Sequence, residues 1–204
     1  MKNLYDREYF ENGISSGVSC YVNYQWMPEL TLLMCKSIID FCKINNRDTI
    51  LDYGCAKGFL VKAMMQLGYD CYGVDISEYA VQKCDPSVRD RIEILTEGKL
   101  KNYDFIVCKD VLEHISYNSL STILCRLRRS CKKLFVVVPL GENGKYVIEE
   151  YEKDITHVIR EDLAWWLKAL SDAGFQDIKS SYSVRGIKDK WSMYDKGNGF
   201  FVCS

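Results

Sequence analysis

Residues 50–59 read ILDYGCAKGF, and this stretch decides the fold. An apolar run typical of a strand leads into a turn with two glycines, and the apolar residues of a helix follow. Such a turn lets a ligand approach the backbone, and the start of the helix offers it free N–H groups. A second apolar run ends at Asp75, roughly 20 residues after Asp52, where a carboxylate can accept hydrogen bonds from both hydroxyls of a ribose. Together these segments predict a nucleoside site at the carboxyl edge of a parallel sheet.

The glycine pattern narrows the kind of nucleoside. A dinucleotide site uses G-x-G-x-x-G to seat a pyrophosphate, but only Gly54 and Gly58 are present here, and Asp52 comes just before them. A carboxylate in that place would repel a pyrophosphate and attract an ammonium group, directly or through water. A dehydrogenase is therefore disfavoured. The simpler alternative is an ordinary strand-to-helix turn with two incidental acids.

Strands and helices alternate along most of the chain. Apolar spacing predicts helices over residues 26–42, 59–67, 118–131 and 161–173, and a further helix after the N-cap Ser77. Apolar runs predict strands over residues 49–53, 71–76, 91–95, 104–108, 134–138, 175–184 and 200–203. Strands separated by helices form parallel crossovers, and the last two strands, with no helix between them, add an antiparallel strand. The pattern predicts a single α/β domain with a doubly wound sheet and helices on both faces.

Composition and charge disfavour several classes of protein. Lys and Arg number 27 against 28 Asp and Glu, a net charge of −1, so binding of nucleic acid driven mainly by charge is not expected. The longest strongly apolar run, residues 134–140, is far shorter than the roughly 20 residues of a spanning helix. The charged, aromatic first ten residues do not resemble a secretion signal. The ten cysteines form no CxxC pair, so we expect reduced thiols of a cytoplasmic protein rather than disulfides or structural zinc.

Several motifs carry a family resemblance. The turn at residues 52–58 resembles the first motif of class I S-adenosylmethionine-dependent methyltransferases, and Asp75 matches the acid at the end of their second strand. Residues 103–115, YDFIVCKDVLEHI, are similar to the fourth-strand motif, above all in the ending LEHI. The DITH segment, the late helix with its AGF turn and the opening YDREYF resemble the small-molecule branch, which includes sugar and natural-product methyltransferases. The match spans nearly the whole chain and is more specific for fold and cofactor than for substrate.

The resemblance implies a Rossmann-like, seven-stranded sheet of order 3-2-1-4-5-7-6 with strand 7 antiparallel. It also implies S-adenosyl-L-methionine as the cofactor and S-adenosyl-L-homocysteine as the product. The first motif would hold the methionyl part, Asp75 the ribose and Ile76 the adenine, while Lys109 would turn its backbone carbonyl toward the methionyl ammonium. The implied cofactor-binding residues are Asp52, Gly54, Cys55, Ala56, Gly58, Asp75, Ile76, Thr96 and Lys109.

Two positions depart from the family pattern. Ala56 stands where the usual middle glycine would be, and we expect it to be tolerated because the helix already opens there. The family often has an acid after the third strand that reaches the adenine amine. In this chain the residue at that place is Thr96 or Glu97.

Both histidines of the chain, His114 and His157, follow predicted strands of the sheet. They therefore fall at its carboxyl edge, where ligands bind in such folds. Methylation of a hydroxyl requires loss of its proton, which suits an imidazole. We expect His157, His114 and Asp110 to be catalytic, with His157 preferred. The alternatives are a helix-cap or core role for each histidine and a solvated loop position for Asp110. No metal is expected: Asp110, Asp154 and His157 could converge, but no spacing demands it.

Aromatic residues crowd the first 26 positions. In the resembled fold an N-terminal segment often closes over the cofactor, so we expect residues 1–45 to form a lid or helical segment and residues 46–204 the core. The hydroxyls of Tyr9, Tyr21 and Tyr24 could then bind a carboxylate or sugar hydroxyl of the substrate. Packing of these rings onto the sheet is an equally open alternative.

The expected function is methyl transfer from S-adenosylmethionine to a hydroxyl or amine of a small molecule, such as a sugar or glycan precursor or a natural product. We expect a monomer or homodimer without a membrane partner. One alternative is a catalytically silent subunit that binds the cofactor. Another is a methyltransferase that acts on tRNA or protein.

Overall fold

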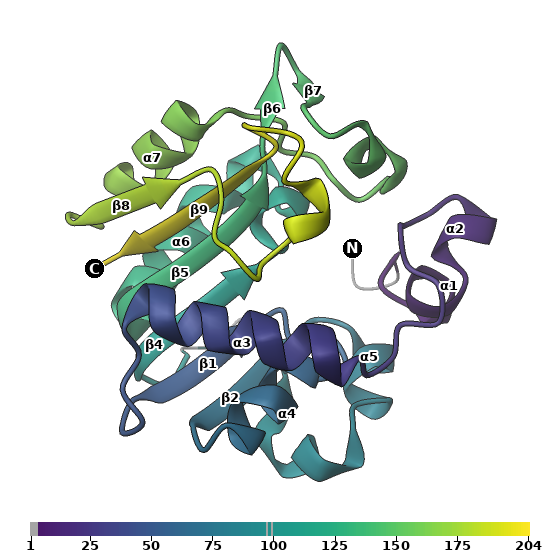
Figure 1. The fold of residues 1–204 in the computed structure, drawn as a ribbon, viewed down its shortest axis with the longest axis vertical. Coiled ribbons are helices and arrows are strands. Elements are labelled where there is room, and N and C mark those ends of the chain that lie inside the picture. Colours follow the sequence, from purple (N-terminus) through teal and green to yellow (C-terminus); the bar gives the residue numbers. More distant parts are fainter. Residues whose placement is uncertain (1–3, 97, 99) are drawn as a thin grey trace.

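A seven-stranded sheet of order β3-β2-β1-β4-β5-β9-β8 forms the centre of the molecule (Figure 1). The computed structural model describes residues 4–96, 98 and 100–204, so Glu97 lies outside the described residues. β9 runs antiparallel to β5 and β8, and the other pairs are parallel. This is the predicted order, with β8 and β9 as the sixth and seventh strands. The strands are β1 (Thr49–Tyr53), β2 (Asp70–Asp75), β3 (Ile92–Ile94), β4 (Tyr103–Lys109), β5 (Cys131–Pro139), β8 (Ile178–Ser181) and β9 (Asn198–Cys203).

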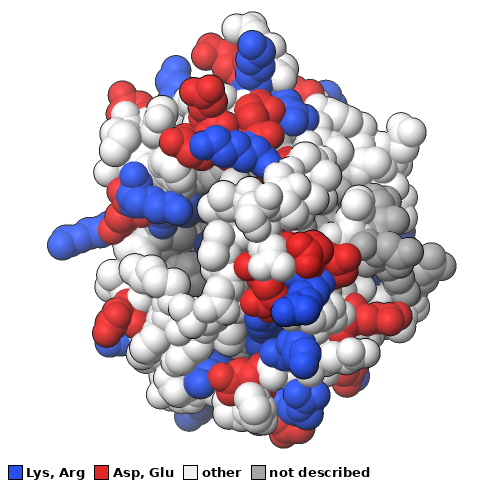
Figure 2. Space-filling view, turned by 90° about the vertical axis from the view of Figure 1, so that its right-hand side faces the viewer, with Lys and Arg blue, Asp and Glu red and all other residues white. Residues whose placement is uncertain are grey.

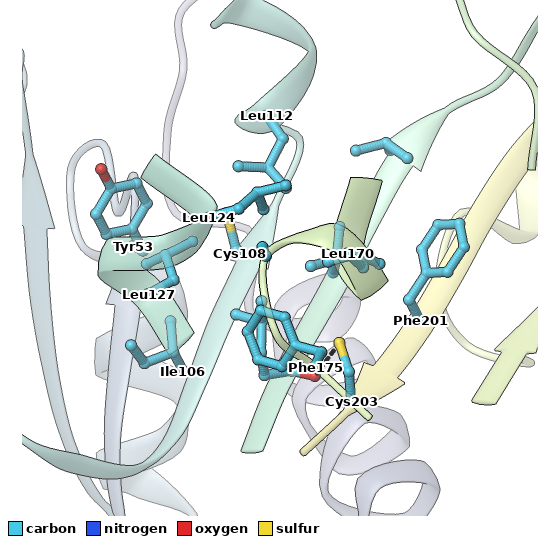
Figure 3. Packing of buried hydrophobic residues seen from close by; sticks show 14 of the residues in the cluster. Tyr53, Ile106, Cys108, Leu112, Leu124, Leu127, Leu170, Phe175, Phe201 and Cys203 are labelled. Atoms are coloured by element: carbon cyan, nitrogen blue, oxygen red, sulfur yellow. Dashed lines mark hydrogen bonds between the residues drawn. The ribbon is translucent and has the colours of Figure 1, made fainter. Parts of the chain in front are cut away.

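Helices cover both faces of the sheet, as predicted. α3 (Pro28–Cys42) and α4 (Phe59–Gln66) pack on one face, and α6 (Tyr117–Ser130) and α7 (Leu163–Asp172) pack on the other. Successive side chains of a strand point to opposite faces. In β4, Phe105 and Val107 therefore join the α3–α4 core, whereas Ile106 and Cys108 join the α6–α7 core. Figure 3 shows the second core, with side chains of α6 and α7 packed over the central strands.

The N-terminal segment, residues 4–27, lies apart from these layers. It contains α1 (Arg7–Glu11) and α2 (Gly13–Ser16), which Figure 1 shows beside the sheet rather than over either face. Glu11 accepts hydrogen bonds from Lys57 Nζ (2.6 Å) and from the Tyr79 hydroxyl (2.8 Å). Lys57 belongs to the glycine turn, so the N-terminal segment is fastened directly onto that turn.

Short elements complete the chain, and several elements differ in length from their predictions. The strand predicted over residues 175–184 is only β8, because the chain leaves the sheet at Tyr182 for a long loop that reaches β9. The first long helix begins at Pro28, whose missing N–H suits the first turn of a helix. The described part of the chain contains no helix long and apolar enough to cross a membrane. The remaining elements are α5 (Glu78–Gln82), η2 (Pro86–Arg91), η3 (Leu112–His114), β6 (Gly141–Glu142), β7 (Lys145–Tyr146), η4 (Glu149–Lys153) and η5 (Asp189–Trp191).

Candidate functional site

The glycine turn between β1 and α4 depends on left-handed backbone. Gly54 has φ +85° and Gly58 has φ +78°, a region that L side chains rarely adopt. A Cβ atom on Gly54 would collide with Val111, and one on Gly58 would collide with Ile92. The turn therefore requires glycine at both positions for packing as well as for conformation.

Ala56 also lies in the left-handed region, with φ +48°. The expectation that the helix already opens at this residue is wrong, because α4 begins at Phe59 with Gly58 as its N-cap. A left-handed L residue costs roughly 1 kcal/mol. The Ala56 N–H donates to Asp75 Oδ2 at 2.7 Å, and this bond helps to hold the strained residue in place.

Asp75, at the end of β2, links two elements through the backbone. Its Oδ2 accepts from Ala56, and its Oδ1 accepts from the Ser77 N–H at 2.8 Å, at the start of α5. Burial raises the pKa of this carboxyl, and the backbone hydrogen bonds act in the opposite direction. Ile76, next in sequence, is half-buried, whereas Thr96 is exposed and its carbonyl accepts from Arg126.

A cavity of about 380 Å³ opens beside the turn. Of the predicted cofactor residues, Asp52, Gly54, Cys55 and Lys109 line it, whereas Ala56, Gly58, Asp75, Ile76 and Thr96 do not. The opposite wall comes from the N-terminal segment and from α3. These wall residues are Cys20, Tyr21, Val22, Asn23, Tyr24, Gln25, Met27, Leu30, Thr31 and Met34, and Phe59 and Leu60 of α4 complete the lining.

Asp52 presents a buried carboxylate to this cavity. Burial raises its pKa to about 7, with Lys109 opposing the shift. No described residue donates a hydrogen bond to its carboxylate, although only 5% of Asp52 is exposed. A buried carboxylate without a partner is unfavourable. The Asp52 carboxylate is therefore available to bind a positively charged group in the cavity.

A second cluster of polar side chains joins the N-terminal segment to the segment after β5. The Tyr9 hydroxyl donates to Asp154 Oδ2 (2.9 Å), and the Thr156 hydroxyl donates to Asp154 Oδ1 (2.5 Å). His114 Nδ1 lies 2.8 Å from the same Thr156 oxygen. Because the Thr156 proton points to Asp154, this hydrogen-bond pattern assigns the bridging proton to His114 Nδ1 and leaves Nε2 as an acceptor.

His157 is held in the same tautomer by a different partner. Its Nδ1 lies 2.8 Å from the Tyr151 carbonyl, which can only accept, so its Nε2 also carries a lone pair. The His114 and His157 rings lie 4.6 Å apart between centroids. Burial lowers the pKa of His114 to about 4 and lowers that of His157 as well. Both imidazoles are therefore neutral near pH 7.

Glu113 lies beside the two histidines and is almost fully buried, with 1% exposed. Its Oε2 has no hydrogen-bond partner in the part of the chain that the structure describes. Burial and the charge of Asp110 hold its pKa well above the usual range. One potential ligand atom from each of Glu113, His114 and His157 lies within 4.8 Å of the other two. These three residues are the group that could hold a metal ion.

Asp110 is not a solvated loop acid. Its carboxylate pairs with Lys109 and Lys188, each at 2.5 Å, and the two ammonium groups hold its pKa below the usual range. Lys188 also donates to the Tyr151 hydroxyl (3.0 Å) and to Asn198 Oδ1 (3.1 Å). Asp110 thereby fastens the loop before β9 to the end of β4.

The three predicted tyrosines take different places. Tyr9 lies in the polar cluster, whereas Tyr21 and Tyr24 line the cavity wall with ring centroids 4.9 Å apart. The Tyr24 carbonyl also accepts from Lys57 Nζ at 2.7 Å. Packing and site-lining are therefore not exclusive alternatives for these residues.

Sequence reasoning missed several members of the polar cluster. Glu113 stands next to His114 in the LEHI ending, and that adjacency of carboxylate and imidazole was a signal. Thr156 lies in the DITH segment, but the resemblance gave it no role. The other members come from segments without a motif, so only the fold brings them together. The missed residues are Glu113, Tyr151, Thr156, Lys188 and Asn198.

Comparison with known proteins places the chain in a family. Residues 28–180, most of the chain, match the family described as "Methyltransferase domain". The ubiquinone biosynthesis O-methyltransferase of Bordetella avium is 32% identical over 76 residues, a match that covers 32% of this chain and 32% of that protein. The chain thus aligns with about a third of the length of that relative.

Solved structures share the fold. A SAM-dependent methyltransferase from Archaeoglobus fulgidus has a TM-score of 0.64 at 14% identity, covering 85% of this chain and 93% of that one. The magnesium protoporphyrin IX methyltransferase of Synechocystis, solved with bound SAM, has a TM-score of 0.56 at 18% identity over 86% of this chain and 79% of that one. The expected fold class is confirmed. The chain belongs to the methyltransferase domain family, in agreement with its resemblance to class I S-adenosylmethionine-dependent methyltransferases.

Proposed function

We propose that this protein transfers a methyl group from S-adenosylmethionine to a hydroxyl of a small molecule, such as a sugar, a glycan precursor or a natural product. The supporting observation is the pair of neutral imidazoles, His114 and His157, each with an Nε2 lone pair in a buried cluster. A hydroxyl must lose its proton when it attacks, whereas a neutral amine attacks with its own lone pair. An amine is therefore the second choice of acceptor.

The cavity beside the glycine turn is the proposed cofactor site. S-adenosylmethionine supplies a methyl group on a positively charged sulfur. Asp52 is the proposed partner of the methionyl ammonium, because its buried carboxylate has no donor of its own. Asp75 has lone pairs beyond the two that its backbone bonds use, and we assign them to the ribose. The other proposed contacts are those of Gly54, Cys55, Ala56, Gly58, Ile76, Thr96 and the Lys109 carbonyl.

The polar cluster is the proposed acceptor side. Its hydrogen bonds fix the tautomers of both histidines. His157 is buried, which limits the access of water to its free nitrogen, and His114 is half-buried. We assign the proton-accepting role to His157, with His114 beside it. Asp110 is committed to two lysines, so we assign it the role of holding the loop before β9 against the acceptor. Residues 1–45 would act as the lid, with Tyr9, Tyr21 and Tyr24 facing the ligands.

Charge distribution supports a small acceptor over a nucleic acid. Basic and acidic side chains are intermixed on the face shown in Figure 2, without a continuous basic surface. The relative from Bordetella avium is named for a small-molecule pathway, that of ubiquinone. Among the similar structures, a putative methyltransferase from Haloferax volcanii was solved with its activator Trm112 (TM-score 0.64, 16% identity). A dependent or silent subunit is therefore the rival that the experiment must exclude.

The cellular setting is also a proposal. All ten cysteines are free thiols, and most of them are buried. This supports a reducing compartment, and we propose the cytoplasm. The state as a monomer or a homodimer stays a prediction.

Radiolabelled S-adenosylmethionine, incubated with the protein and panels of hydroxyl compounds, amines, tRNA and proteins, tests the proposal. We expect label in a hydroxyl compound. His157→Asn should lower turnover about 100-fold or more and leave cofactor affinity in calorimetry unchanged. The matched control is Tyr117→Phe, a change at an exposed residue outside the cluster. Label only in tRNA or protein, or an unchanged rate in His157→Asn, would refute the proposed acceptor or the proposed base.

A further inference from the structure

The polar cluster has an imbalance between hydrogen-bond donors and acceptors. Glu113 Oε2 has no partner within the described residues, and His114 and His157 each have only Nε2 left to offer. One potential ligand atom from each of the three residues lies within 4.8 Å of the other two. When Glu113 is ionised, its carboxylate and the two neutral imidazoles are all acceptors, so they repel one another unless a proton or a cation lies between them.

The surroundings of these side chains differ from those of ordinary core residues. A buried polar atom in a core normally finds a partner, and Glu113, with 1% exposed, has not found one for Oε2. Each histidine donates its other ring proton to an oxygen, His114 to Thr156 and His157 to the Tyr151 carbonyl. Metal-binding histidines are oriented by the same arrangement, in which the outer nitrogen donates to a carbonyl or to a hydrogen-bonded oxygen.

From this geometry we infer that Glu113, His114 and His157 form a binding site for one divalent transition-metal ion. One carboxylate and two imidazoles suit Mn²⁺, Fe²⁺, Co²⁺ or Zn²⁺, whereas Mg²⁺ and Ca²⁺ prefer oxygen ligands throughout. Three protein ligands leave coordination positions open, as in catalytic sites. The sequence expectation of no metal depended on spacing alone, and it did not consider Glu113.

Binding requires only a small closure of the site. Ligand bonds of about 2.1 Å bring the three atoms to within roughly 3.5 Å of one another, so the side chains must move inward by about 1 Å. Asp154 Oδ2, 4.0 Å from His157 Nε2, lies just outside and already accepts from Tyr9. Asp154 therefore orients the ligands through Thr156 and neutralises part of the charge of the ion without binding it.

A bound ion would add a chemical role to the proposed function. Only this role of the ion, and not the metal site itself, rests on the proposed function. An acceptor hydroxyl on an open coordination position becomes more acidic, loses its proton to water and leaves an oxygen that attacks the methyl carbon. The carbon–sulfur bond of the sulfonium then breaks, and its electron pair stays on sulfur. With the ion bound, the proton that the proposed function assigns to His157 would go to water instead, and both histidines would act on the hydroxyl as ligands of the ion.

The test is titration of the chelator-treated, full-length protein with MnCl₂, without cofactor or acceptor. Mn²⁺ is the appropriate probe because it binds thiols weakly and the chain has ten free thiols. Electron paramagnetic resonance of free Mn²⁺ and calorimetry should show one ion per chain. Glu113→Gln, which keeps the shape of the side chain, and His157→Asn should each weaken binding at least 10-fold. Glu161→Gln, a carboxylate outside the cluster, should bind as the wild type does.

Two results would overturn the site. One is the absence of saturable binding of Mn²⁺ by the wild-type protein up to 1 mM, and the other is an unchanged affinity in Glu113→Gln. Circular dichroism confirms that each variant is folded, and the wild-type titration decides the question even if a variant is not. If the protein binds Mn²⁺ but methylates no hydroxyl, the proposed function is refuted and the metal site is not. A protein that methylates a hydroxyl at the same rate after chelation refutes the role of the ion.

Discussion

The two sides of the site are assembled in different ways. The nucleoside side is local, since Asp52, Ala56 and Asp75 all belong to β1, the turn after it and β2. The acceptor side is assembled over long separations, and its single hydrogen bond between Tyr9 and Asp154 joins residues 145 positions apart. Positive φ angles strain the backbone of the first side. Both sides also contain a buried carboxylate oxygen without a donor among the described residues, from Asp52 in the first and from Glu113 in the second. A local motif can thus be recognised in sequence, whereas a cluster of this kind is seen only in the fold.

The largest expected effect tests the Asp52 carboxylate on the nucleoside side. Asp52→Asn should weaken binding of S-adenosylmethionine about 10- to 100-fold, because a charged hydrogen bond is lost. The same variant should be more stable without cofactor. The folded-state pKa of Asp52 is about 7 against an ordinary 3.8, so the native state holds this proton to higher pH than the unfolded state. Its contribution to stability therefore falls as pH rises from 4 to 7.

Urea denaturation at several pH values measures this difference between Asp52→Asn and the wild type. The difference should be near zero at pH 4 and grow to about 4 kcal/mol above pH 7. Asp177→Asn, a change at an exposed acid, serves as the control. A difference in the free energy of unfolding that does not change with pH would show that Asp52 does not titrate as a buried carboxylate.

The next effect tests whether the two sides are independent. Asp154→Asn removes the charge that orients Thr156 and, through it, His114. Turnover should fall about 10- to 100-fold, since a wrong tautomer disables an imidazole. Cofactor affinity in calorimetry should not change. An equal loss of cofactor affinity would mean that the two sides are coupled, and the comparison between them would fail.

A moderate effect tests the structural part of the nucleoside side. Asp75→Asn leaves one acceptor oxygen for two backbone donors, so one buried N–H loses its partner. The free energy of unfolding should fall by about 1 to 3 kcal/mol, together with a weaker affinity for the cofactor. Thermal denaturation and calorimetry measure the two losses separately. Unchanged stability would mean that Asp75 serves only to bind the cofactor and does not stabilise the fold.

The smallest effect tests the strain in the turn. Ala56→Gly should stabilise the protein by about 0.5 to 1 kcal/mol, because glycine adopts φ +48° without the penalty of a Cβ atom. Gly68→Ala, at φ +86° and with open space around it, should be destabilised by a comparable amount. Urea denaturation of both variants gives the sign of each change in the free energy of unfolding. A destabilised Ala56→Gly would mean that chain entropy outweighs the strain at this residue.

Much of the fold follows from periodicity. The strand at residues 49–53 was predicted residue for residue, and Ser77 caps α5 as expected, with its hydroxyl accepting from the Ala80 N–H. Continuous apolar runs carry this information because each central strand is buried on both faces. The end of β8 could not be predicted in this way, since the polar residues after it suit a strand edge and a loop equally.

The site could be predicted only in part, for a related reason. Asp52 and the glycines form a motif because a turn constrains neighbouring residues. Glu113, by contrast, stands in the LEHI ending, and its meaning depends on His157, which comes from the loop between η4 and α7. Ion pairs between residues far apart in the sequence could not be predicted either. Nothing near Asp110 indicated Lys188, which comes from the loop before β9.

Helix α1, only five residues long, is attached to both sides of the site. Its Tyr9 donates to Asp154 of the polar cluster, and its Glu11 accepts from Lys57 of the glycine turn. A displacement of this one short helix would therefore disturb the glycine turn and the polar cluster together.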